Sequence, residues 1–424
     1  MVIFIYNLLF PLIFLFFVPN LILKLVKRTG PKDTYLERFG LFSDEVKVKL
    51  QNLSNPVWVH AVSVGETQIA VSFIKLWKKQ NPNINFVLST TTTTGQELAR
   101  RNAPEDVVVI FCPIDFILIV KKVIKLIKPK ILILFETEIW PNLIFESNKA
   151  GTKVVQVNAR ISDHSFKGYY KYRKFISPFL SKLTVSCAQS ELDASRLCEI
   201  CPTLNVVQAG NMKFDQKIPV DIPDIDLKEV FGNGSYRILI GASTHPDEEK
   251  LIASAFKSLM KEFHDFRLIL IPRHSERGND VASILKDLGI SFKQRSKKKN
   301  PAGVVGCLLA DTTGEMVSFM DKSEIVIVGK SFTGNDEGQN VIEPALMGKA
   351  VITGLKLKNF RHVMDLMKKK NAIISVGDDE LEDSIRNLLK DPDVCKKQGN
   401  IAKAAVTEHI GATQRTIDIV KKYV

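Results

Sequence analysis

Acidic, basic and hydroxyl side chains gather directly after several apolar runs of this sequence. Glu66, Glu136 and Glu138 follow such runs in the first half of the chain, and Arg273 follows one in the second half. A carboxylate at a turn can act as a general base, and an arginine offers bidentate hydrogen bonds to a phosphate or carboxylate. These residue types therefore predict acid–base chemistry in one half of the chain and binding of an anionic group in the other.

The apolar runs alternate with amphipathic stretches in strand–helix order. Strands are expected at 57–61, 85–89, 107–111, 131–135 and 154–158, and in a second series at 237–240, 267–271, 325–328 and 351–353. Continuous apolar strands separated by helices predict an α/β fold with parallel sheets covered on both faces. In such sheets, ligands bind beyond the carboxyl ends of the strands, where the polar residues lie.

Length and composition limit the class of protein. The chain has 424 residues, 45% of them hydrophobic, which excludes a disordered or fibrous protein. Its formal charge of +13 suits anionic partners without choosing among phosphates, nucleic acid and lipid head groups. The cysteines show no spacing typical of a disulfide framework, which indicates a reducing compartment. We predict two doubly wound, Rossmann-like domains at residues 31–217 and 227–424, joined by a Pro- and Asp-rich linker at 218–226.

Two common nucleotide-binding motifs are missing. No GxGxxG follows a strand, and Gly329-Lys330-Ser331 fails as a phosphate-binding loop because Glu324 stands where a glycine is needed. These absences argue against an oxidoreductase and a nucleoside triphosphatase. Basic residues are dispersed and no aromatic-rich RNA-binding strand is present, so no nucleic-acid partner is expected.

A series of longer motifs carries the most specific signal. Read in order, the motifs are HAVSVGE (60–66), TTGQE (93–97), ETEIWPN (136–142), NARIS (158–162), AQSE (188–191), GNMKFD (210–215), STHP (243–246), PRH (272–274), DTTGE (311–315) and NVIEP (340–344). The series resembles the bacterial transferases of 3-deoxy-D-manno-octulosonic acid (Kdo) in lipopolysaccharide synthesis, from about Tyr35 to about Phe360. The chain departs from the family pattern at Lys330 and Gln339, where glycine and histidine are usual.

The resemblance implies a GT-B glycosyltransferase whose two domains face a cleft. The amino-terminal domain would bind the acceptor, a lipid A precursor (lipid IVA), and the carboxyl-terminal domain would bind the donor, CMP-Kdo. Kdo would be transferred with inversion. CMP-Kdo is a substrate, and neither a cofactor nor a metal is expected, because the single phosphate of CMP needs cationic and amide donors more than a bridging metal.

Three catalytic residues are expected, and the resemblance places the family's catalytic glutamate at the first of them, Glu66. Glu66 is the expected base, although an isolated glutamate at this turn is equally typical of a helix cap. Glu138 is expected to steady positive charge on the sugar or to orient the acceptor. Glu136 is a further candidate for that role, and simple bracing of the loop by either glutamate stays open. Lys213 would supply positive charge for the phosphate, across the cleft from Glu66.

Donor-binding residues are expected in the second domain: Pro272, Arg273, His274, Thr313, Gly314, Glu315, Asn340 and Glu343. Arg273 would bind the phosphate and Glu343 the ribose, as an acid at such a turn commonly does in GT-B enzymes. His274 would contact the nucleotide or simply satisfy a turn. The segment 313–315 is expected to open a helix whose amide groups suit a phosphate or the cytosine edge.

Two hydroxyl residues, Ser243 and Thr244, are further candidates for the phosphate or the sugar. As residues that precede Glu248, they fit equally well as caps of the next helix.

The amino end predicts a membrane anchor. Residues 2–23 carry no charge, and Lys24, Lys27, Arg28 and Lys32 follow at once. This run is long enough for one bilayer crossing, and the positive flank keeps the rest of the chain in the cytoplasm. Prolines in the run keep a helix lying in the interface open as an alternative. We therefore expect residues 1–30 to attach the enzyme to the cytoplasmic face of the bacterial inner membrane.

Two rival functions share these features. A GT-B transferase that uses a UDP-sugar on a membrane lipid would have the same fold, anchor and charge. A non-enzymatic, membrane-attached nucleotide-binding protein would have no need of Glu66.

Overall fold

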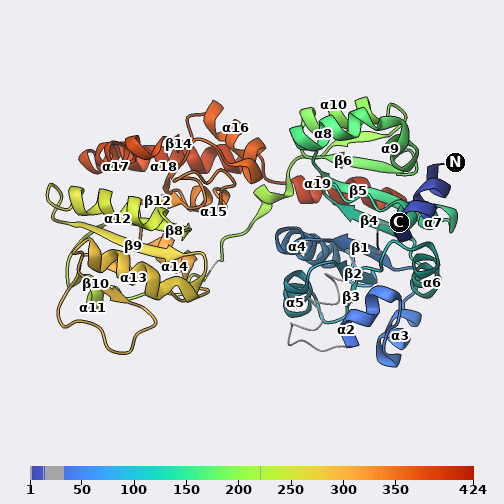
Figure 1. Cartoon of the computed structure of the whole chain (residues 1–424), viewed down its shortest axis with the longest axis horizontal. Coiled ribbons are helices and arrows are strands. Elements are labelled where there is room, and N and C mark those ends of the chain that lie inside the picture. The colour runs from blue at the N-terminus through green and yellow to red at the C-terminus, as the bar shows by residue number, and fades with distance from the viewer. Residues whose placement is uncertain (1, 13, 15–32, 220) are drawn as a thin grey trace. The chain divides into compact units, whose positions relative to one another are not determined.

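The computed structural model describes all residues except 1, 13, 15–32 and 220, and it divides the chain into two compact units (Figure 1). The first unit is Met1–Lys213 together with Gly411–Val424, and the second is Phe214–Ile410. We expected the second domain to run from 227 to the end of the chain. In the structure the second unit begins at Phe214, before the expected linker, and residues 411–424 belong to the first unit.

The first unit is built on a seven-stranded parallel sheet of order β3-β2-β1-β4-β5-β6-β7. Its strands are β1 (Val57–Ala61), β2 (Phe86–Thr90), β3 (Val108–Phe111), β4 (Ile131–Phe135), β5 (Lys153–Ala159), β6 (Val185–Ala188) and β7 (Val206–Gln208). Its helices are α2 (Asp33–Leu36), α3 (Asp44–Gln51), α4 (Val64–Gln80), α5 (Thr93–Asn102), α6 (Ile117–Ile127), α7 (Pro141–Lys149), α8 (Asp163–Lys171), α9 (Arg173–Leu180), α10 (Glu191–Ile200) and α19 (Ala412–Val420).

Strand β1 shows that the sheet is covered on both faces. All five of its residues are buried. Val57, Val59 and Ala61 pack into one apolar cluster, whereas Trp58 packs into another, because successive side chains of a strand point to opposite faces. Helices α4 and α5 begin at hydroxyl caps, Ser63 and Thr92, which accept hydrogen bonds from backbone N–H groups of the first turn.

Helix α19 returns the end of the chain to the first unit. Ala412, Ile417 and Val420 are buried in the cluster that contains Val57 and Val59. The Arg415 guanidinium also donates to the Ala209 carbonyl oxygen (3.0 Å). These contacts explain why the expected domain boundary and the observed units differ at the carboxyl end.

The second unit repeats the design with a parallel sheet of order β10-β11-β9-β8-β12-β13-β14. Its strands are β8 (Arg237–Thr244), β9 (Phe266–Pro272), β10 (Phe292–Gln294), β11 (Cys307–Leu309), β12 (Ile325–Val328), β13 (Ala350–Thr353) and β14 (Ile374–Ser375). Its helices are α11 (Lys228–Phe231), α12 (Glu248–Leu259), α13 (Gly278–Asp287), α14 (Met316–Asp321), α15 (Ile342–Leu346), α16 (Arg361–Lys369), α17 (Leu381–Lys390) and α18 (Pro392–Thr407). The prediction of two parallel α/β sheets is confirmed.

At the amino end, residues 2–12 and 14 are helical. Most of the expected anchor, and all of its basic flank, lies outside the described residues. Within the described part of the chain, no helix has both the length and the apolar character that a membrane crossing requires.

Candidate active site

Three carboxylates follow two neighbouring strands of the first sheet. Glu66 lies in the first turn of α4, directly after β1, and Glu136 and Glu138 lie in the turn after β4. Strands β1 and β4 pair in parallel, so their carboxyl ends meet at one edge of the sheet. The sheet therefore brings together the acidic residues that the sequence singled out.

Glu66 is held by three hydrogen bonds at the start of α4. Its Oε2 accepts from the Val62 N–H (2.9 Å) and its Oε1 from the Ser63 hydroxyl (2.8 Å), while the Glu66 N–H donates to the Ser63 Oγ (3.3 Å). The N-cap residue of α4 is Ser63, and the Glu66 side chain adds hydrogen bonds to the residues just before the helix. Burial raises the pKa of Glu66, and the negative charge of Glu136 raises it further, against the lowering effect of these hydrogen bonds.

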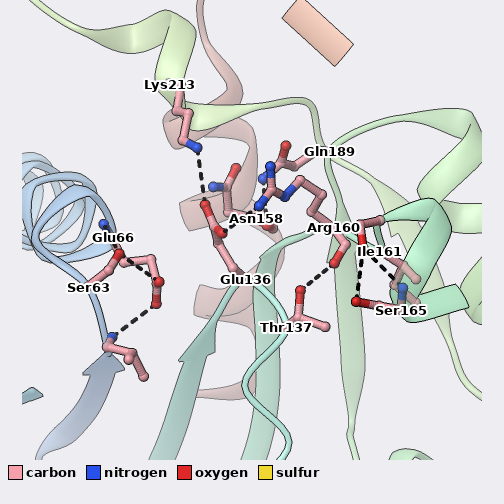
Figure 2. Close-up of polar contacts among 12 residues, drawn as sticks. Ser63, Glu66, Glu136, Thr137, Asn158, Arg160, Ile161, Ser165, Gln189 and Lys213 are labelled. Carbon is pink, nitrogen blue, oxygen red and sulfur yellow. Dashed lines mark hydrogen bonds and ion pairs between the residues drawn. The ribbon is translucent and has the colours of Figure 1, made fainter. Parts of the chain in front are cut away.

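Two cations converge on Glu136 (Figure 2). Lys213 Nζ lies 3.4 Å from Oε1, and the Arg160 guanidinium lies 3.8 Å from Oε2. The Glu136 side chain is only 12% exposed, so these pairs are partly shielded from water. Lys213 was expected to serve the donor phosphate; in the structure it pairs with Glu136.

Asn158 connects the sheet to the segment that carries Lys213. It is the last residue but one of β5 and has a positive φ of 52°, a conformation that asparagine tolerates better than most residues. Its side-chain Oδ1 accepts from the Met212 N–H (3.0 Å), and its carbonyl oxygen accepts from the Gln189 amide (2.9 Å). Asn158 thus fixes the backbone next to Lys213.

Glu138 has the most perturbed carboxyl group of this cluster. Its Oε2 accepts a hydrogen bond from the Trp140 indole N–H (2.8 Å). Burial and the negative charges of Glu66 and Glu136 together raise the pKa of Glu138 to about 7, against the lowering effect of the Trp140 hydrogen bond. A carboxyl group with this pKa can both take up and release a proton near neutral pH.

Sequence reasoning assigned no role to Arg160 or Asn158, although both lie in a motif that it singled out. The signal was their place at the carboxyl end of a buried strand: Asn158 lies near the end of β5, and Arg160 directly follows it and reaches Glu136. The Thr137 hydroxyl donates to the Arg160 carbonyl oxygen (Figure 2), which connects the turn after β4 to the segment after β5.

In the second unit, a pocket of about 140 Å³ gathers most of the expected donor residues. Its lining includes Ser243, Pro272, Arg273, Thr313, Gly314 and Glu315. Arg273 is exposed, whereas Ser243 is 8% exposed and has a positive φ of 54°. Pockets for whole small ligands measure about 300–1,000 Å³, so this pocket has room for only part of a nucleotide.

Two details of this pocket differ from the prediction. Helix α14 begins at Met316, so Thr313 and Gly314 form the turn before it rather than its first residues. The Glu315 carboxylate is bonded to Arg295 (2.7 Å) and to the Thr312 hydroxyl, so it braces the turn.

The remaining donor candidates lie outside that lining. His274 is exposed, and its ring contacts that of His245. Asn340 donates to Gln216 (2.8 Å) and accepts from the Ile342 N–H (3.0 Å), which satisfies the start of α15. Burial raises the pKa of Glu343, and no charged group among the described residues offsets that effect.

The capping alternative for Ser243 and Thr244 is wrong. The N-cap residue of α12 is Asp247, and the Thr244 hydroxyl instead donates to Glu249 (2.9 Å). Glu249 in turn pairs with Arg277 (2.6 Å). Thr244 is fully buried, so its hydroxyl satisfies the buried Glu249 carboxylate in the interior of the second unit.

A buried carboxylate explains why Gly329-Lys330-Ser331 does not work as a phosphate-binding loop. Glu248 accepts hydrogen bonds from the N–H groups of Lys330 (2.8 Å), Ser331 (2.7 Å) and Phe332 (2.9 Å). These donors would cradle a phosphate in such a loop. Gly329 permits this packing, since a Cβ there would lie 2.2 Å from the Ser243 carbonyl oxygen.

Comparison with known proteins identifies the family. A family model described as 3-deoxy-D-manno-octulosonic-acid transferase (kdotransferase) matches residues 33–216. The 3-deoxy-D-manno-octulosonic acid transferase of Rickettsia felis is 31% identical over 326 residues, which cover 76% of this chain and 69% of that protein. The chain belongs to the 3-deoxy-D-manno-octulosonic acid transferase family. The Haemophilus influenzae transferase is 28% identical over 94% of this chain and 93% of its own length.

The Kdo transferase is thus a glycosyltransferase, and its architecture agrees with that class. The crystal structure of a glycosyltransferase from Rickettsia africae superposes with a TM-score of 0.59 at 15% identity, covering 88% of this chain and 99% of that one. At this identity the similarity shows the fold alone. The expectation of two parallel-sheet α/β domains resembling GT-B enzymes is confirmed.

The raised pKa of Glu138 predicts a pH-dependent cost to stability. A carboxyl group whose pKa is raised on folding stabilises the protein below its ordinary pKa, and that stabilisation is lost as the pH rises through about 7. Glu138→Gln should therefore raise Tm more at about pH 8 than at about pH 5, since the amide still accepts from Trp140 and never ionises.

Thermal unfolding scans of wild type and variant at both pH values measure this difference. Glu97→Gln, an exposed position on α5, is the matched control and should show the same small Tm change at both pH values. A Tm change for Glu138→Gln that does not depend on pH would show that this carboxyl titrates normally.

Proposed function

We propose that the enzyme transfers Kdo from CMP-Kdo to a lipid A precursor, lipid IVA, with inversion at the sugar carbon, as a step of lipopolysaccharide synthesis. The observation that carries the proposal is the convergence of Glu66 and Glu138 at the carboxyl ends of the paired strands β1 and β4, where burial raises the pKa of both carboxyl groups. Family membership supports the sugar, and the expected motif roles support the donor and the acceptor.

Glu66 is the proposed base. An acceptor hydroxyl becomes a better nucleophile when a carboxylate takes its proton as the new bond forms. The hydrogen bonds from Val62 and Ser63 hold the Glu66 carboxylate in one orientation, so little motion is needed before proton transfer. Glu138 would stabilise positive charge as the donor sugar becomes oxocarbenium-like.

Lys213 and Arg160 have a second role in this proposal. Their pairing with Glu136 concentrates positive charge beside the acidic cluster. Kdo is itself a carboxylate-bearing sugar, and CMP leaves with a negative phosphate. Cations at this edge would therefore attract the donor while they compensate Glu136.

The second unit is the proposed donor-binding half. Arg273 would bind the CMP phosphate from the rim of the pocket that it lines with Ser243 and Thr313. Glu343, whose carboxyl group has no offsetting charge among the described residues, would accept hydrogen bonds from the ribose hydroxyls. We propose no metal and no cofactor for the reaction, since these side chains supply the charge that a single phosphate requires.

The amino-terminal segment is proposed to attach the enzyme to the cytoplasmic face of the inner membrane. Its helix exposes large apolar side chains, among them Phe4 (72% exposed) and Leu8 (62% exposed). An exposed apolar helix face is typical of a segment that inserts into a bilayer interface. A lipid acceptor would be presented at the same surface.

Glu66→Gln tests the base. The amide oxygen can still accept from Val62, so the helix start should persist while kcat falls by about a hundredfold or more. Kinetics with CMP-Kdo and detergent-dispersed lipid IVA, together with Tm, measure both effects. Glu45→Gln, at an exposed glutamate of α3, is the control and should leave kcat unchanged. A kcat of Glu66→Gln within threefold of wild type would remove Glu66 from the mechanism.

Arg273→Ala and Glu343→Gln test the donor site. Loss of a charged hydrogen-bond partner should raise the Kd of CMP by about tenfold. Isothermal titration calorimetry measures it, with Arg101→Ala, an exposed arginine of the first unit, as the charge-matched control. UDP should bind more weakly than CMP to the wild type; an unchanged CMP Kd in both folded variants, or tighter binding of UDP, would contradict the donor assignment.

The apolar face of the amino-terminal helix predicts how membrane binding is lost. The double change Phe4→Ser with Leu8→Ser should lower co-sedimentation with anionic lipid vesicles, because less apolar area is buried in the interface. Turnover on detergent-dispersed acceptor should not change. Val304→Ser, an exposed apolar position of the second unit, is the control (64% exposed). Unaltered vesicle binding of the double variant would exclude this face as the attachment site.

A further inference from the structure

Asp115 caps a helix from a distant segment. It lies between β3 and α6, is 1% exposed, and accepts hydrogen bonds from the backbone N–H groups of Asn142 (2.9 Å) and Leu143 (2.8 Å). These are first-turn groups of α7, which have no partner within their own helix. The N-cap residue of α7 is Trp140, and it provides no side-chain cap. Asp115 therefore takes the place of the missing N-cap side chain.

The amino-terminal helix completes this network. The Tyr6 hydroxyl donates to the same Asp115 Oδ2 that accepts from Asn142 (2.9 Å). The Asn142 side-chain amide donates both to Asn7 Oδ1 (2.7 Å) and to the Asp115 carbonyl oxygen (2.7 Å). The Tyr6 ring meets Phe179 of α9 edge-on, 6.4 Å between centroids. Figure 1 shows the amino-terminal helix beside α7.

The start of α7 is also the end of the acidic turn. Residues 136–140 connect β4 to α7 and contain Glu136, Glu138 and Trp140. The Glu136 N–H donates to the Val157 carbonyl oxygen (3.0 Å), which fixes the turn at the sheet. At its other end the turn is fixed by the first residues of α7, since Asp115 binds the N–H groups of Asn142 and Leu143, and Asn7 binds the Asn142 side chain.

We propose that Tyr6, Asn7 and Asp115 are positioning residues that hold the turn 136–140, and with it the carboxyl group of Glu138, in place for sugar transfer. The amino-terminal helix is then part of the catalytic unit as well as its membrane attachment. This inference rests on the proposed function for its kinetic readout but not for its structural one.

The charge on Asp115 explains why Tyr6 matters. A negative charge at a helix N-terminus is stabilising, whereas burial favours the neutral acid. Burial raises the pKa of Asp115 to about 6, and the hydrogen bonds from Asn142, Tyr6 and Leu143 act in the opposite direction. Loss of the Tyr6 hydroxyl would remove one of the donors that keep Asp115 ionised.

Tyr6→Phe is the deciding variant, because it keeps the ring and removes only the hydroxyl. In detergent with lipid IVA, kcat should fall by about tenfold while the KM for CMP-Kdo and the Kd of CMP stay unchanged. Asp115→Asn should lower kcat further, because it removes the charge as well. Tyr170→Phe, at an exposed tyrosine (41% exposed), is the matched control and should leave kcat unchanged.

Tryptophan fluorescence reads the position of the turn without catalysis. Trp58 and Trp77 are buried (0% and 1% exposed), whereas Trp140 is half-buried within the turn, so acrylamide quenching should report mainly on Trp140. A Trp140→Phe variant assigns the signal. Tyr6→Phe should increase quenching, because a loosened turn exposes the indole.

The two readouts separate the possible failures. Unchanged quenching in a folded Tyr6→Phe protein would overturn the positioning role, whatever happens to kcat. Increased quenching with unchanged kcat would overturn the link to catalysis. If the wild type itself transfers no Kdo, the proposed function fails, and the quenching experiment still decides whether the amino-terminal helix holds the turn.

Discussion

The approach of three carboxyl groups at one edge of the first sheet is the constraint on which the surrounding elements depend. Carboxylates that lie close together and partly shielded from water raise one another's pKa unless cations compensate their charge. Here Lys213 and Arg160 both pair with Glu136, whereas burial raises the pKa values of Glu66 and Glu138. The cations are thus concentrated on one carboxylate, and the other two groups remain able to exchange protons. When their environments give neighbouring carboxyl groups different pKa values, one site can hold groups with different proton-transfer roles.

That division of charge depends on backbone geometry at the strand ends. Glu136 directly follows β4 and Asn158 lies at the end of β5, each with a φ of 52°, a region that few residues adopt and that recurs at functional sites. Asn158 binds the Met212 N–H, and farther back Arg415 of α19 binds the Ala209 carbonyl oxygen. The segment that delivers Lys213 is therefore fixed from two sides, once by the sheet and once by the last helix of the chain.

The sequence could predict the features that depend only on a local pattern of residues. Buried central strands are continuous apolar runs, so β1, β4 and β12 were predicted with the bounds that the structure has. The short strands β6, β7, β10, β11 and β14 were missed, since runs of only two to four residues seldom show a pattern. The return of residues 411–424 to the first unit could not be predicted, because its cause is the burial of Ala412, Ile417 and Val420 against residues far away in the chain. The candidate carboxylates were recognised from their motifs, whereas the contacts of Tyr6 with Asp115 depend on tertiary packing.

Glu66 illustrates why a structural and a catalytic interpretation of one residue need not compete. Hydrogen bonds that satisfy the first turn of α4 also fix the rotamer of the carboxylate, and a fixed rotamer is what a base requires. The same bonds favour the ionised form, whereas burial and the charge of Glu136 favour the protonated form, and burial is the largest of these effects. A glutamate at the start of an exposed helix, without neighbouring carboxyl groups, would keep its ordinary pKa. The raised pKa of Glu66 therefore comes mainly from burial, with a smaller contribution from the charge of Glu136, and the hydrogen bonds from Val62 and Ser63 limit how far that pKa can rise.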